Sequence, residues 1–160
     1  MNDDSIKKLE AKMAKLEKHY SKDRMSILKY IQDNINVDIN PVIEGYCKKS
    51  VRNYWKGLAE QKTDHSIQAL VKHLWDEHCK PSGFEYEVEV TDEGVQMKCT
   101  YCPLVDEAKE SGGTEIGYSC FCATDPAIVE GFNPNIGFKR TKTLMEGDEC
   151  CDHFYYLKKK

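Results

Sequence analysis

Apolar residues in the first half of the chain recur three or four positions apart, on one stripe among lysine and glutamate. This spacing predicts amphipathic helices. Four helices are expected, over residues 6–20, 25–35, 41–58 and 67–78. The second should end before Pro41, because a residue that precedes proline is pushed out of the helical region. Thr63 or Asp64 is expected to cap the fourth helix, and Pro81 to end it.

The first helix carries its apolar stripe over about two heptads, whereas a coiled coil needs about three or four. The stripe consists of Ile6, Leu9, Met13, Leu16 and Tyr20. We therefore expect this helix to pack on its own domain, and a homodimer formed through it is the alternative.

After residue 83 the apolar residues alternate with polar ones, and the period becomes two. Alternation of this kind predicts strands with one buried and one solvent-exposed face. Two β-hairpins are expected, with strands at residues 84–90, 95–101, 136–140 and 150–157 and turns at 91–94 and 146–148.

A helical crossover is expected between the two hairpins. Pro103 suits the first turn of a short helix that Cys102 would cap. A second helix should begin at Thr114, with Pro126 as its kink or its end.

The order of these elements predicts the fold class. N-terminal helices followed by β-β-α-β-β indicate an α+β protein, with a four-stranded antiparallel sheet covered by helices on one face. The 160 residues fit a single domain, 1–160. Its helical half is 1–80, and its sheet-containing half is 84–157.

Composition and charge narrow the class of partners. The net charge of −4 gives no basic face for phosphate, so nucleic acid is not an expected partner. No apolar run approaches the roughly 18 to 20 residues of a membrane span, and the N-terminus lacks the apolar segment of a secretory signal. We expect a cytoplasmic protein without a membrane partner, whose thiols remain reduced.

Six of the eight cysteines form three close pairs, which are Cys99 with Cys102, Cys120 with Cys122, and Cys150 with Cys151. The Cys-x-x-Cys spacing of the first pair suits two ligands of a zinc ion, and zinc needs about four. The single residue between the second pair is a less usual geometry. The alternative is that these thiols are buried and behave as small apolar side chains.

A cluster of reactive side chains is expected where the crossover meets the last strand. As a helix N-cap, Cys102 should have a lowered pKa. Cys122 and Asp125 are three residues apart on the expected crossover helix, and Cys151 shares a strand face with His153. These side chains converge if the helix covers that strand. A packed, hydrogen-bonded histidine is the alternative at His153.

Two residues near the last turn are candidates for substrate binding. Arg140 ends a strand and is able to hold a carboxylate through two hydrogen bonds. Glu146 lies in the turn that follows. Solvated surface residues are the alternative for both.

Residues 133–153 resemble the C-terminal signature of the L-2-amino-thiazoline-4-carboxylic acid hydrolase family. Cys102-Pro103, the Cys-x-x-Asp of residues 122–125 and the Gly-Asp-x-Cys-Cys-Asp of 147–152 match in order, and the resemblance covers roughly 40–157. It implies hydrolysis of a thiazoline, or of another small cyclic amidine or amide, to a carbamoyl-cysteine type of product. The order of elements is also similar to ligand-binding domains of the vinyl-reductase and TRAPP type, at the level of fold only.

Two mechanisms fit such a hydrolysis. In the first, which we favour, the Cys102 thiolate attacks the ring carbon, Asp125 or His153 moves protons and Arg140 holds the substrate carboxylate. In the second, a divalent metal such as zinc is bound by Cys102, Cys122 and Cys151 with Asp125 or His153, and lowers the pKa of a bound water. The candidate catalytic residues are Cys102, Cys122, Asp125, Cys151 and His153, and the candidate substrate-binding residues are Arg140 and Glu146. A ligand-binding or sensing module without turnover and a structural zinc domain are the alternative functions.

Overall fold

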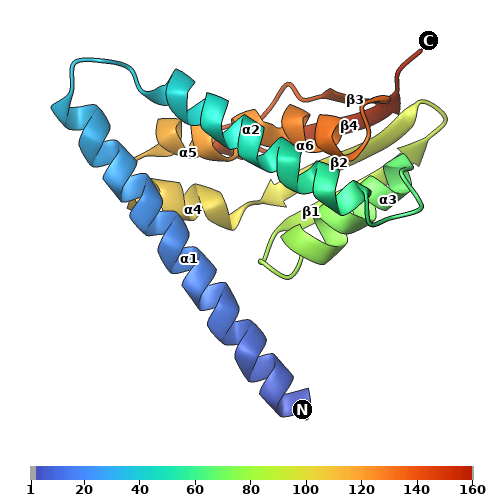
Figure 1. Cartoon of the computed structure of the whole chain (residues 1–160), viewed down its shortest axis with the longest axis horizontal. Helices are drawn as coiled ribbons and strands as arrows, with labels where there is room; N and C mark the ends of the chain where they lie inside the picture. The colour runs from blue at the N-terminus through green and yellow to red at the C-terminus, as the bar shows by residue number, and fades with distance from the viewer. Residues whose placement is uncertain (1–2, 160) are drawn as a thin grey trace.

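The computed structural model describes residues 3–159, and within this range all side chains except those of residues 3–7, 9–11, 14 and 17. It confirms the α+β class and the β-β-α-β-β order (Figure 1). The helical elements are α1 (Asp3–Asn34), α2 (Asn40–Ala59), α3 (Ile67–Val71), η1 (Lys72–Cys79), α4 (Pro103–Glu110), α5 (Thr114–Cys120), η2 (Cys122–Thr124), α6 (Asp125–Phe132) and η3 (Leu144–Glu146). The strands are β1 (Glu85–Thr91), β2 (Gly94–Tyr101), β3 (Ile136–Lys139) and β4 (Cys151–Leu157).

The four strands form one antiparallel sheet in the order β1-β2-β4-β3. Alternate residues of the two central strands are buried on the same face of the sheet. The buried residues of β2 lie directly opposite those of β4 in the pairs Val95–Tyr155, Met97–His153 and Cys99–Cys151. This face forms one wall of the site described below.

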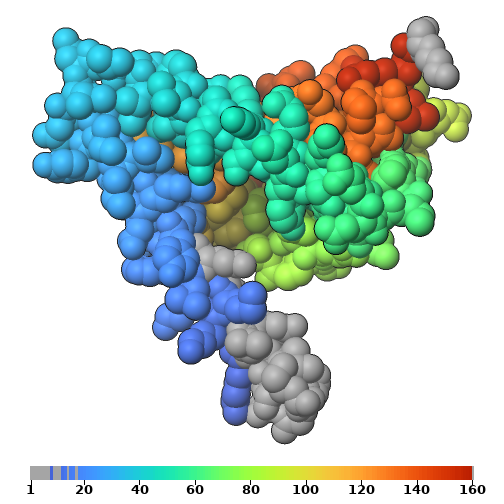
Figure 2. All heavy atoms as spheres, viewed as in Figure 1, coloured from blue at the N-terminus to red at the C-terminus, as the bar shows by residue number. Residues whose placement is uncertain are grey.

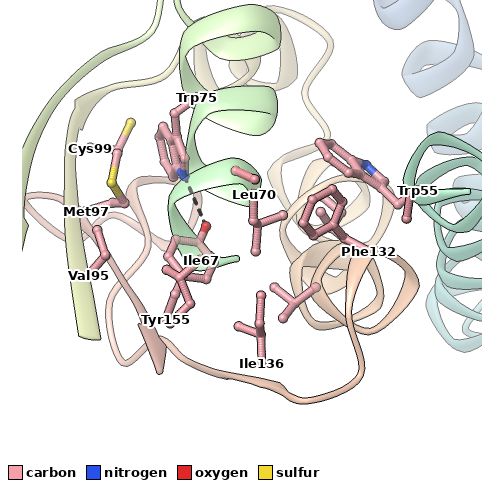
Figure 3. Close-up of a cluster of buried hydrophobic side chains, with 14 of the residues drawn as sticks. Trp55, Ile67, Leu70, Trp75, Val95, Met97, Cys99, Phe132, Ile136 and Tyr155 are labelled. Carbon is pink, nitrogen blue, oxygen red and sulfur yellow. Dashed lines mark hydrogen bonds between the residues drawn. The ribbon is translucent and has the colours of Figure 1, made fainter. Parts of the chain in front are cut away.

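The hydrophobic core consists of two clusters. In the larger one, Trp55 packs on Phe132, and the same cluster continues through Leu70 to Tyr155 (Figure 3). The smaller one lies among α1, α2, α4 and α5. Cys102 and Leu144 pack against both clusters, so the boundary between the clusters runs through the region that carries the sequence motifs.

Residues 3–34 form one helix, and the prediction of two helices in this region was wrong. The interruption in the apolar pattern between Tyr20 and Met25 contains no glycine or proline, so the backbone continues through it. Met25 is fully buried, whereas Met13 is 52% and Leu16 45% exposed.

The first part of α1 therefore does not pack on the domain as expected. Figures 1 and 2 show α1 projecting as a long arm. The side chains of Ile6 and Leu9 in the predicted stripe lie outside the described residues. No helix within residues 3–159 is long and apolar enough to cross a membrane.

The fourth predicted helix begins at a different cap and changes its geometry. Ser66 is the N-cap, because its side chain accepts a hydrogen bond from the backbone N–H of Ala69, while Asp64 accepts one from Ser66. After Val71 the helix widens into the π-helical segment η1. This segment carries the buried Trp75, whose indole N–H donates to the hydroxyl of Tyr155 at 3.1 Å (Figure 3).

The crossover is interrupted at Phe121, which has a non-helical backbone with φ −120° and ψ −65°. Pro126 lies in the first turn of α6, where its missing N–H costs nothing, so the expectation that it ends or kinks a helix was wrong. Cys122 and Asp125 consequently do not share one α-helix. Cys122 lies in the short turn η2, and Asp125 begins α6.

Candidate active site

A cavity of about 510 Å³ lies where the two core clusters meet, bordered by α2, η1, the central strands and the α5–α6 turn. Its volume is in the range of small-molecule sites. Seven of the eight cysteines line it, together with aromatic side chains such as Trp75, Phe84 and Tyr155. Figure 2 shows the face between α1, α2 and the start of β1 hollowed.

Six of the seven predicted site residues line this cavity. They are Cys102, Cys122, Asp125, Arg140, Cys151 and His153. They come from four different parts of the chain, so the fold brings together the motifs that the sequence keeps apart. Glu146 is not among the lining residues.

Asp125 is the polar centre of the site. Its Oδ2 accepts a hydrogen bond from Nη1 of Arg140 and lies 3.1 Å from Nε2 of His153. Arg140 also donates to the carbonyl of Cys122 at 3.1 Å and to the hydroxyl of Tyr118 at 3.3 Å. With its guanidinium engaged in this way, Arg140 holds Asp125 in place. This arrangement does not support the expected role of Arg140 as a free carboxylate clamp.

The imidazole of His153 has one partnered and one unpartnered nitrogen. The ring is packed between Trp75 and Phe138, with ring centroids 5.0 and 5.7 Å away. The Asp125 carboxylate can only accept, which places a proton on Nε2. Nδ1 is buried without a hydrogen-bond partner among the described residues. A buried unpaired nitrogen costs about 1–3 kcal/mol, and a bound ligand at Nδ1 would recover it.

The thiol of Cys151 is surrounded by groups that stabilise its ionised form. The neighbouring thiol of Cys99 lowers the pKa of Cys151 below its usual value, helped by the backbone N–H of Leu144 and by His153, against the opposing effect of burial. The N–H of Leu144 lies 3.3 Å from Sγ. The hydroxyl of Thr143 is 3.8 Å from Sγ. Among the cavity thiols with a shifted pKa, Cys151 is therefore the one whose ionised form its surroundings favour.

The loop that aims the Leu144 N–H at Cys151 is held by the two aspartates of the 147–152 motif. Asp152 accepts from the backbone N–H groups of Thr141 at 2.8 Å and Lys142 at 2.6 Å. Asp148 accepts from the N–H of Thr143 at 2.7 Å. The chain then reverses at Gly147, whose φ of +96° lies in the left-handed region that glycine adopts without strain.

Comparison with protein families places the chain in a family. A family model described as L-2-amino-thiazoline-4-carboxylic acid hydrolase matches residues 9–155. The chain belongs to this family. The match begins earlier than the resemblance at residue 40 and includes most of α1. Neither the curated proteins nor the solved structures give a match.

In this family member Cys102 is not the ionised thiol, and the prediction of a lowered pKa was wrong. Cys102 is the N-cap of α4, as expected. Burial raises its pKa to about 12, although the backbone N–H groups of Leu104 and Val105 act in the opposite direction. Burial, together with the charge of Asp125, also raises the pKa of Cys122 to about 12. At Cys102 the loss of hydration therefore raises the pKa by more than the helix N-terminus lowers it.

Glu146 is the second residue that the structure places differently from the expectation. It lies in η3 with its side chain exposed to solvent and away from the cavity lining. The 3₁₀ turn leaves its carboxylate outside, while Met145 beside it is buried. The structure therefore gives no support to a substrate-binding role for Glu146.

The cysteines do not form the metal site that the sequence suggested. Within the part of the chain that the structure describes, no group of three His, Cys, Asp or Glu side chains is placed to hold a metal ion. Cys102, Cys122 and Cys151 border the same cavity without converging as ligands, and Arg140 is paired with the carboxylate of Asp125. The residues do not fit the metal route or the structural zinc domain.

One lining residue was missed by the sequence analysis. Arg24 of α1 reaches the cavity and lies over the ring of Phe121, with 5.0 Å from its guanidinium carbon to the ring centroid. No carboxylate of the described residues is within ion-pair distance of it. Nothing in the sequence connects position 24 with the crossover, because their contact depends on how α1 packs against α5.

Proposed function

We propose that this protein hydrolyses a small cyclic amidine or amide of the thiazoline type and opens its ring to a carbamoyl-cysteine-like product. Membership of the L-2-amino-thiazoline-4-carboxylic acid hydrolase family supports a hydrolase function. The observation that carries the proposal is the environment of Cys151. Its sulfur receives the Leu144 N–H and shares a cavity with the Asp125–His153 pair.

In the first proposed step, the thiolate of Cys151 attacks the ring carbon that lies between the two heteroatoms. A carbon–sulfur bond to the enzyme forms, and one ring bond from this carbon to a heteroatom breaks. Before this step the thiol of Cys151 gives its proton to Nδ1 of His153, so that both ring nitrogens carry a proton. The departing heteroatom takes the proton from Nδ1, while Asp125 keeps the ring oriented through Nε2. The product of this step is a covalent adduct on Cys151.

In the second proposed step, water releases the adduct. Nδ1 of His153 removes a proton from the water, which adds to the same carbon. The bond to Cys151 then breaks and restores the thiolate, with His153 protonated again. The net change is the addition of one water and the opening of one ring bond.

Arg24 is proposed to hold an acid group on the substrate. The deeper arginine, Arg140, is engaged by Asp125, whereas Arg24 keeps its guanidinium available at the cavity. Hydrogen bonds between a guanidinium and a carboxylate are among the strongest that proteins form. The assignment favours a substrate that carries a carboxylate next to the ring.

The test is to incubate the purified protein with L-2-amino-thiazoline-4-carboxylate and to follow the substrate and carbamoyl products by mass spectrometry. The parent should consume the substrate. Cys151→Ser should lose about a thousandfold or more of the rate, as expected for a nucleophile. The matched control Cys102→Ser, at a lining cysteine with a raised pKa, should stay within about tenfold.

Two results would contradict the proposal. One is a Cys151→Ser variant that is as active as the parent. The other is a parent that binds the thiazoline and a panel of related lactams without consuming any of them, which would indicate a ligand-binding or sensing module.

A further inference from the structure

Cys99 and Cys151 form a cross-strand pair behind the cavity. They lie directly opposite each other on β2 and β4, and both side chains are on the buried face, 1% and 7% exposed. The two side chains are close enough for each thiol to shift the pKa of the other, and the thiol of Cys99 donates a hydrogen bond to the carbonyl of Tyr101 at 3.2 Å. Directly opposed residues of antiparallel strands have Cα atoms about 4.5–5.5 Å apart, which is within the range of about 4.4–6.8 Å that a disulfide spans.

We propose that this pair is a site of oxidative modification, which a small hydroperoxide converts into a Cys99–Cys151 disulfide. Both residues line the cavity, which gives a reagent of this size a route to them although they are buried. The site requires no movement of the backbone, because the sheet already holds the two residues in register.

The chemistry balances with the hydroperoxide as the oxidant. The thiolate of Cys151 attacks one peroxide oxygen, so that a sulfur–oxygen bond forms and the oxygen–oxygen bond breaks. The other oxygen leaves with a proton taken from the solvent, as an alcohol, or as water when the reagent is hydrogen peroxide. The sulfur of Cys99 then attacks the sulfenic sulfur, the sulfur–sulfur bond forms, and water leaves with the proton of Cys99. The two thiols together supply the two electrons that reduce the hydroperoxide.

The surroundings select Cys151 over the other thiols of the cavity. The Leu144 N–H and the thiol of Cys99 favour its thiolate, which is the form that reacts with peroxide. A second thiol pair, Cys47 with Cys120, also lies on the lining. Burial raises the pKa of Cys120 to about 11, so that pair should react more slowly.

The experiment is thiol mapping of the full chain after one equivalent of hydrogen peroxide, with alkylation under denaturing conditions and mass spectrometry of non-reduced peptides. Free thiols should fall from the eight of the sequence by two. The lost pair should be Cys99 and Cys151, and dithiothreitol should restore both. No substrate is involved, so a failure of the proposed hydrolysis leaves this result independent.

Two variants sharpen the test. In Cys99→Ser, the sulfenic acid on Cys151 has no partner, so it should be trapped by dimedone and should proceed to the sulfinic acid that dithiothreitol does not reverse. The matched control Cys47→Ser should form the Cys99–Cys151 disulfide like the parent. Two results with the parent protein would overturn the proposal. One is a Cys47–Cys120 disulfide instead of Cys99–Cys151, and the other is no loss of thiols at a tenfold excess of peroxide.

Discussion

Cys102 is the N-cap of α4 and Cys151 begins β4, and both residues line the same cavity. A helix N-terminus stabilises a nearby anion by about 0.3–1 kcal/mol, which is less than one pKa unit. Burial is able to shift a thiol pKa by several units in the opposite direction. At Cys102 burial is the larger effect, and the pKa rises. At Cys151 the groups around the sulfur outweigh burial, and the pKa falls.

Arg24→Gln tests the proposed recognition of the substrate acid group. Losing one charge-assisted hydrogen bond costs about 1.5–3 kcal/mol, so KM for the thiazoline carboxylate should rise about ten- to a hundredfold while kcat changes little. The matched control Lys22→Gln removes a cation of α1 that pairs with Glu110 and does not line the cavity.

Steady-state kinetics with an uncharged analogue that lacks the carboxylate completes the Arg24 test. The analogue should show the same KM with the parent and with Arg24→Gln. An unchanged KM for the acid, or an equal rise for both compounds, would remove Arg24 from substrate binding.

At the scale of elements, the loop between β3 and β4 connects the sequence motif to the reactive sulfur. Asp152→Ala removes the acceptor of the Thr141 and Lys142 N–H groups. The free energy of unfolding should fall by about 1–3 kcal/mol, and the pKa of Cys151 should rise because the Leu144 N–H loses its fixed position. Urea denaturation and pH-dependent alkylation measure the two effects.

The control for Asp152→Ala is Glu146→Ala, at an exposed position of the same loop, which should change neither quantity. Hydrogen bonds from Thr141 and Lys142 keep the pKa of Asp152 below its usual value, against the effect of burial. Its contribution should therefore be complete above about pH 4 and be lost as the pH falls through its folded-state pKa. A stability difference that persists in full at pH 2 would contradict this explanation.

Much of the β-rich half could be predicted because its signals are local. The alternation of apolar and polar residues predicted the two hairpins, and Pro103 predicted the start of α4. The expected buried face of β1 was wrong, because Val88 and Val90 of this edge strand are exposed. The continuity of α1 could not be predicted, because periodicity reports which side chains are buried and not whether the backbone continues. The break in the crossover at Phe121 could not be predicted either, because a proline such as Pro126 is compatible with the end or with the first turn of a helix.

The candidate site was predicted as a set of residues but not as a mechanism. The motifs at Cys102, at Cys122 to Asp125 and at Cys151 to His153 do meet at one cavity. Their relative acidity depends on burial and on backbone N–H groups such as that of Leu144, which no motif encodes. The assignment of the reactive thiol therefore needed the tertiary structure.

At the scale of the whole molecule, the projecting half of α1 leaves a homodimer through this helix as a prediction. Met13, Leu16 and Tyr20 are exposed within the described part of the stripe. Light scattering should give twice the chain mass of 18.4 kDa for the parent. Leu16→Glu should give a monomer, while Lys18→Glu, outside this stripe, should remain a dimer. A single-chain mass for the parent at all concentrations would exclude the dimer.

The role of Cys151 as the nucleophile is tested most directly by pH-dependent alkylation of each cysteine with iodoacetamide in the native protein, read by peptide mass spectrometry. We predict that Cys151 is labelled first, with a rate that levels off below the usual thiol pKa of about 8.5. Cys102 and Cys122 should remain unlabelled over this range. Faster labelling of Cys102, or a Cys151 rate that begins to rise only above about pH 9, would contradict the assignment of Cys151 as the nucleophile.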